Sequence, residues 1–193
     1  MFSKKFIASQ VIFLIFLAVV FFAFRPFSRE PLPVYAGIAP FELTDSLDRK
    51  VSLRDLHGKV WVANFMFTTC SGICPMMTRN MGMIYRNFQN DDALRFVSVS
   101  VNPENDAPDV LKKYAEKNGA DPQKWIFLTG SRDDIQKLVA GSFKLGDIKE
   151  PVFHSSYFAL VDRQGRIRGY YDGTEDIAVQ KLLKDIMRLR KER

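Results

Sequence analysis

The feature that most constrains this sequence is an apolar run, Val60 to Phe67, followed after a short gap by a segment with helical spacing. The run is rich in β-branched and aromatic residues and lies between a Gly-Lys turn and a threonine pair. Such a run is typical of a strand that is buried on both faces of a sheet. From Pro75 to Phe88, apolar residues recur at helical spacing, and proline is favoured in the first helical turn. The pattern predicts a buried strand that leads into a helix.

The same alternation of strand and helix continues to the end of the chain. A small hairpin (FELTDSLDRKVSL) precedes the first core strand, further strands are expected at 93–101 and 125–130, a hairpin within 155–173, and helices at 107–119, 131–143 and 174–192. Parallel strand–helix–strand units that are closed by an antiparallel hairpin and a helix predict an α/β, thioredoxin-like fold. We therefore expect residues 40–193 to form one domain with a central mixed β-sheet flanked by helices.

The N-terminal part of the chain has the character of a membrane anchor. Residues 6–24 carry no charged side chain and are nearly all apolar, and about 20 such residues cross a bilayer as a helix. A cleaved signal peptide is the alternative, but its apolar core is usually only about 7–15 residues long. We expect a transmembrane helix at 6–24, a cytoplasmic stub at 1–5, and a single-pass protein of the inner membrane whose C-terminal domain lies on the periplasmic side.

A proline-rich stretch, residues 25–39, follows the expected anchor and predicts an extended tether that holds the domain off the membrane. The formal net charge of +6 is spread along the chain rather than gathered in one segment. No cluster of Lys and Arg with interleaved aromatic residues is found in the sequence. The sequence therefore predicts no nucleic-acid partner.

Both cysteines of the sequence, Cys70 and Cys74, lie in the segment FMFTTCSGICPMM. A domain of this length can bury a core without disulfides, and a bridge around so short a loop would add little stability. A purely structural disulfide is therefore a weak explanation. In the predicted fold the pair lies at the carboxyl end of the first core strand, which is the edge where open α/β sheets bind their ligands.

Cys74 precedes Pro75 and is expected at the N-terminus of the helix, where backbone N–H groups and the helix dipole favour a thiolate. The spacing to Cys70 allows the two sulfurs to form a disulfide or to bind one metal ion. A dithiol of low pKa thus indicates one of two chemistries, exchange with other disulfides or binding of a soft metal.

Two histidines bear on that choice. His57 lies in a polar turn and is expected to be solvated. His154 lies between two apolar stretches at the start of the late hairpin, where it is either a buried histidine bonded to backbone groups or a metal ligand. In a thioredoxin-like fold this segment faces the cysteine turn, so an imidazole there can complete a site of two sulfurs and one nitrogen. Such a set suits Cu(I), whereas Zn(II) needs a fourth ligand.

Three segments (FTTCSGICP, SVNPENDAPDVLKKYAEKNG and FHSSYFALVDRQGRIRGYY) resemble the SCO/SenC family of copper proteins that assemble cytochrome c oxidase. The resemblance extends from about Ile38 to the C-terminus. It implies that Cys70, Cys74 and His154 bind copper, as Cu(I) or Cu(II). It also implies a metallochaperone that delivers copper to, or reduces the thiols of, the binuclear CuA centre of oxidase subunit II or another acceptor. An upstream copper donor or a thiol reductant would be a further partner.

The sequence departs from the family pattern near the expected ligands. Ser71 and Gly72 replace a proline and a polar residue after the first cysteine, Phe153 replaces an aspartate before the histidine, and Asn102 replaces another. The loss of two carboxylates is expected to reduce the hydrogen bonding and negative charge around the metal.

The alternative function is that of an enzyme or redox sensor. In this hypothesis a membrane-tethered thiol–disulfide oxidoreductase cycles Cys70 and Cys74 between dithiol and disulfide, and His154 tunes their reactivity. The primary expectation remains a metal-binding assembly factor.

Other chemically suggestive residues have simpler explanations. Helix packing accounts for four methionines without thioether binding: Met76, Met77, Met81 and Met83. Asp106 and Asp109 lie near an expected helix start, where a carboxyl caps the helix or favours its dipole.

Overall fold

The computed structural model describes residues 30–145 and 156–192. The predicted stub at 1–5, the predicted anchor at 6–24 and His154 lie outside the described residues. One compact unit spans Leu32–Arg193. Within the described ranges, no helix is both long enough and apolar enough to cross a bilayer.

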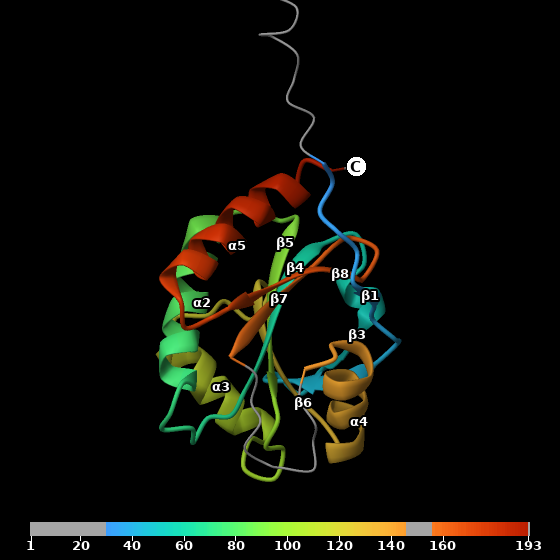
Figure 1. The fold of residues 1–193 in the computed structure, drawn as a ribbon. Coiled ribbons are helices and arrows are strands. Elements are labelled where there is room, and N and C mark those ends of the chain that lie inside the picture. Colours follow the sequence, from blue (N-terminus) through green and yellow to red (C-terminus); the bar gives the residue numbers. More distant parts are fainter. Residues whose placement is uncertain (1–29, 146–155, 193) are drawn as a thin grey trace, which may run out of the picture. The chain divides into compact units, whose positions relative to one another are not determined.

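The compact unit is built on one eight-stranded sheet of order β1-β8-β7-β4-β5-β6-β2-β3 (Figure 1). The strands are β1 (Ala36–Gly37), β2 (Glu42–Asp45), β3 (Lys50–Ser52), β4 (Val60–Met66), β5 (Leu94–Ser100), β6 (Trp125–Thr129), β7 (Tyr157–Val161) and β8 (Arg166–Asp172). The central strands β4, β5 and β6 are parallel, and the outer pairs are antiparallel. This mixed sheet confirms the predicted thioredoxin-like α/β fold.

Helices cover both faces of the sheet, as Figure 1 shows. On one face lie α2 (Cys74–Phe88), α3 (Pro108–Lys117) and α5 (Asp176–Leu189). On the other lie the 3-10 turn η1 (Leu53–Leu56), α4 (Arg132–Gln136) and the π-helix η2 (Lys137–Ser142). The helix predicted at 131–143 therefore changes its winding part-way. The Phe143 N–H donates to the Leu138 carbonyl at 3.0 Å, which is the bond of a π turn, and both side chains are buried in the core.

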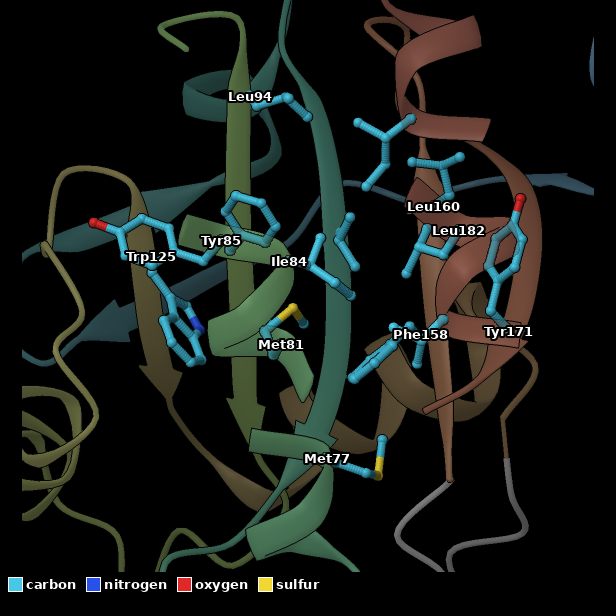
Figure 2. Packing of buried hydrophobic residues seen from close by; sticks show 14 of the residues in the cluster. Met77, Met81, Ile84, Tyr85, Leu94, Trp125, Phe158, Leu160, Tyr171 and Leu182 are labelled. Carbon is cyan, nitrogen blue, oxygen red and sulfur yellow. The ribbon is translucent and has the colours of Figure 1, made fainter. Parts of the chain in front are cut away.

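The side chains of β4 alternate between two apolar cores. One set faces α2 and α5 (Val60, Val62 and Met66), and the other faces η2 (Trp61, Ala63 and Phe65). The prediction of a strand buried on both faces is confirmed. Figure 2 shows the first core, in which Met77 and Met81 of α2 lie among other buried apolar side chains such as Ile84 and Phe158. The packing interpretation of these two methionines is also confirmed.

The boundary predicted between tether and domain lies too late in the chain. Residues 25–39 were predicted to be tether, but the compact unit begins at Leu32, and Leu32 and Ile38 are buried. Strand β1 pairs with β8 at one edge of the sheet, and the Arg168 side chain donates to the Leu32 carbonyl at 2.6 Å. The local sequence shows none of these partners because they come from the other end of the chain.

Candidate metal centre

The segment from Phe67 to Cys74, here called the cysteine turn, connects β4 to α2. Both of its cysteines are thiols. Cys74 is the first residue of α2, and the N–H of Cys70 donates to the Phe67 carbonyl at 3.2 Å. Because β4 runs parallel to β5, the turn lies at the carboxyl edge of the parallel strands, where the sequence predicted it.

The two thiols lie in different environments. Cys74 is 1% exposed, and its burial together with a hydrogen bond to Cys70 raises its pKa to about 12. Burial also opposes ionisation of Cys70, but hydrogen bonds from the Cys74 thiol and from the backbone N–H groups of Cys74, Gly72 and Ile73 outweigh it and lower the pKa of Cys70. Cys70 is therefore the thiol that ionises first.

This assignment reverses the prediction that Cys74 carries the thiolate. The helix N-terminus does stabilise a sulfur anion, as expected, but the sulfur belongs to Cys70. The side chain of Cys74 turns into the apolar core beneath α2, whereas its N–H group serves the neighbouring thiol. Which sulfur faces the helix N-terminus depends on the folded turn and cannot be seen from the spacing alone.

The structure brings two of the three predicted ligands together. Over residues 30–145 and 156–192, no group of three His, Cys, Asp or Glu side chains is placed to hold a metal ion. The third predicted ligand, His154, lies outside that range. Strand β7 pairs antiparallel with β4, with Ala63 opposite Ala159, so the start of β7 lies toward the carboxyl end of β4. The second histidine, His57, is exposed, as predicted.

Asp106 is a buried residue near the cysteine turn, and its role differs from the one that the sequence predicts. It is fully buried, and its carboxyl accepts hydrogen bonds from the Thr68 N–H at 3.0 Å, from the Thr68 hydroxyl and from the Ser100 hydroxyl at 2.6 Å. The prediction that it caps a helix is wrong, because α3 begins after Ala107 without a side-chain cap. Its partner in the cysteine turn lies far away in sequence, so the local pattern could not reveal it.

Tyr114 of α3 also lies close to the thiols. Its hydroxyl lies 2.9 Å from the Thr78 hydroxyl of α2. Burial raises the pKa of Tyr114, the Thr78 hydrogen bond opposes this, and negative charge on the two nearby sulfurs, when they ionise, raises the pKa further. The helix α3 thus contacts α2 in the turn that follows Cys74.

Comparison with known protein families shows which family the chain belongs to. The family model described as SCO1/SenC matches residues 31–190. The chain belongs to the SCO1/SenC family. It is 35% identical over 161 residues to the SCO1 protein homolog of Bacillus subtilis (strain 168), a match that covers 80% of this chain and 83% of that protein.

Solved structures give the same result. BsSco, described as a member of the Sco family of cytochrome c oxidase assembly proteins with a disulfide switch, superposes with a TM-score of 0.74 at 34% identity, covering 84% of this chain and 98% of BsSco. ScoI of Bradyrhizobium japonicum, solved with copper bound, superposes with a TM-score of 0.65 at 26% identity, covering 80% and 99%. The likeness supports the thioredoxin-like fold, and the family is one of copper-binding cytochrome c oxidase assembly proteins.

Proposed function

We propose that this SCO1/SenC protein is a membrane-anchored copper metallochaperone that delivers copper to the CuA centre of cytochrome c oxidase subunit II, or reduces the thiols of that centre. In this proposal Cys70 and Cys74 bind the ion through sulfur and His154 binds it through nitrogen. The observation that carries the proposal is the hydrogen-bonded pair of thiols in the cysteine turn. Two thiols held together are a soft ligand set that suits Cu(I).

The properties of the two thiols suit the uptake and release of a copper ion. Cys70 is partly exposed and has a lowered pKa, so it offers a thiolate to an incoming ion. Cys74 retains its proton until a metal displaces it, and metal binding therefore releases a proton to solvent. The start of β7 at the carboxyl end of β4 supports the approach of His154 to the two sulfurs. A site of three ligands leaves a position open to a ligand from the acceptor protein.

The membrane location belongs to the same proposal. An uncharged apolar segment at 6–24 would anchor the chain in the inner membrane, with the copper-binding domain on the periplasmic side. The anchor would keep the domain near a membrane-bound oxidase subunit.

The ligand set is tested by loading the reduced full chain with Cu(I) in detergent and comparing wild type with His154→Ala. We expect X-ray absorption of the wild type to show two sulfurs and one nitrogen. We expect His154→Ala to lose the nitrogen and to bind Cu(I) about tenfold or more weakly. The exposed His57→Ala is the matched control and should behave as wild type. Equal affinity and an unchanged spectrum in His154→Ala would remove His154 from the site.

The difference between the thiols also favours a second function, that of a thiol–disulfide oxidoreductase. An accessible thiolate at Cys70 could attack a substrate disulfide and release one substrate thiol, and Cys74 could then attack the mixed disulfide and release the other. The two electrons that reduce the substrate come from the Cys70–Cys74 dithiol. Fast turnover of a disulfide substrate without copper would favour this function over copper delivery.

A further inference from the structure

We infer that Asp106 is a positioning residue that holds the cysteine turn in the geometry in which its two sulfurs act together. This inference deepens the proposed copper function and rests on it only for the metal readout. It is carried by the contacts of the Asp106 carboxyl, a buried polar group whose place in the fold is otherwise unexplained.

A buried carboxyl is costly unless its oxygens are hydrogen-bonded. Both oxygens of Asp106 are used: one accepts the Thr68 N–H and the Ser100 hydroxyl, and the other accepts the Thr68 hydroxyl. Among the residues that the structure describes, no basic side chain forms an ion pair with Asp106. Its bonds are therefore directed at the exit of β4 and the end of β5 rather than at a compensating cation.

These contacts fix the start of the cysteine turn. Thr68 lies between Met66, the last residue of β4, and Cys70. Two bonds from Asp106 to Thr68 hold its backbone and its side chain at once. The end of β5 is also tied to β4, because the Val101 N–H donates to the Met66 carbonyl at 2.9 Å. Cys70 consequently begins its turn from a fixed backbone position.

The far end of the turn is contacted by the helix that follows Asp106. Asp106 lies two residues before Pro108, the first residue of α3, and Tyr114 within α3 contacts Thr78 at 2.9 Å. Thr78 follows Cys74 by one turn of α2, and the Cys74 side chain itself is buried in the core. The segment from Asp106 to Tyr114 thus spans the turn from its first residues to the first turns of α2, and it sets the separation of the two sulfurs.

The consequence is measurable because the sulfurs act as a pair. Oxidation of the two thiols by glutathione disulfide forms the Cys70–Cys74 disulfide and releases two molecules of glutathione, so its equilibrium constant depends on how closely the fold holds the sulfurs. A loosened turn lowers that constant and, for the same reason, lowers the affinity for Cu(I). We expect Asp106→Ala in the full chain to lower each by about tenfold.

Two variants separate position from charge and from general stability. In Asp106→Asn the amide oxygen can accept from the Thr68 N–H and Ser100, and the amide NH₂ can donate to the Thr68 hydroxyl, so this variant should restore most of both values. Ser98→Ala is the matched control, because Ser98 forms a buried network on β5 with Asn64 (2.7 Å) and Trp125 (2.9 Å) that does not include the cysteine turn. We expect it to lower the melting temperature and to leave both constants unchanged.

The outcomes are distinct. If Asp106→Ala matches Ser98→Ala in both constants, or if Asp106→Asn is as defective as Asp106→Ala, the positioning role is overturned. If the wild type fails to bind Cu(I) but Asp106→Ala still shifts the glutathione equilibrium, the copper proposal fails and the positioning role stands. Should Asp106→Ala not fold, Thr68→Val removes only the hydroxyl contact and is expected to give a smaller shift of the same sign. No shift in that variant would overturn the inference.

Discussion

At the scale of single residues, the chemistry of this protein depends on an unequal pair of thiols. Cys70 and Cys74 are close in sequence, yet one has a lowered pKa and the other a pKa of about 12. Burial in the core raises the pKa of Cys74, whereas hydrogen bonds from the Cys74 thiol and from backbone N–H groups at the helix start lower that of Cys70. Such a pair combines a thiol that ionises easily with a buried thiol that keeps its proton.

This asymmetry predicts the order in which the thiols react. Only the thiolate is alkylated, so a lowered pKa moves reaction to lower pH and a raised pKa moves it to higher pH. In reduced, metal-free protein we expect iodoacetamide to modify Cys70 first, at a pH below the ordinary thiol value of about 8.5, and Cys74 only near the top of the accessible pH range. Peptide mass spectrometry after timed labelling measures this order, and urea-unfolded protein serves as the control. Earlier labelling of Cys74 would contradict the thiol assignment.

At the scale of secondary-structure elements, α4 and η2 form one helical segment with two kinds of winding. Ser131 starts it as a cap: its hydroxyl accepts from the Asp134 N–H at 3.1 Å and donates to the Asp134 carboxyl at 2.6 Å. Only Ile135 of α4 is buried, so this short helix depends on its cap more than a well-packed helix would.

We therefore expect Ser131→Ala to reduce the free energy of unfolding by about 1 kcal/mol. Urea denaturation followed by circular dichroism measures the change. Gln136→Ala, at an exposed position of the same helix, keeps helix propensity and should change stability by no more than about 0.5 kcal/mol. Equal effects of the two substitutions would show that the cap is unimportant.

At the scale of the whole molecule, a buried arginine joins segments from both ends of the domain. Arg168 of β8 donates to the Leu32 carbonyl at 2.6 Å and forms ion pairs with Asp162 at 3.0 Å and Glu192 at 2.7 Å. It thereby connects the first residues of the compact unit to the β7–β8 hairpin and to the end of the chain. Water cannot replace these acceptors, because the Arg168 side chain is only 5% exposed.

Removal of this side chain leaves buried acceptors without a donor, so Arg168→Met should destabilise the protein by about 3–5 kcal/mol. The control is Arg166→Met, which removes the 45% exposed partner of the same carboxyl and should cost less than about 1 kcal/mol. Thermal unfolding at neutral pH measures both. Similar losses from the two variants would show that burial of Arg168 adds nothing.

The same ion pair predicts a dependence on pH. Burial opposes ionisation of Asp162, but hydrogen bonds from Arg166 and Arg168 outweigh it and lower the pKa of Asp162. A lowered pKa in the folded state adds stability above the unfolded value of about 3.9, and this stability is lost as pH falls through the folded value. The difference between wild type and Arg168→Met should therefore narrow in acid.

Much of this protein was determined by its sequence alone. The apolar run at Val60, the helical spacing after Pro75 and the late hairpin are local patterns, and each formed the predicted element because side-chain period and burial agree along a short stretch. The position of the cysteine pair between a core strand and a helix followed from the same patterns.

Only the tertiary structure decided three further points: that Cys70 rather than Cys74 has the lowered pKa, that Asp106 bonds to the cysteine turn instead of capping α3, and that the chain from Leu32 joins the sheet. Each depends on where a side chain or a backbone group points after folding. The partners of Asp106 and of Leu32 come from distant parts of the chain, and no local period records such contacts. Sequence pattern therefore located the chemistry, and the contacts of the folded chain assigned the individual roles.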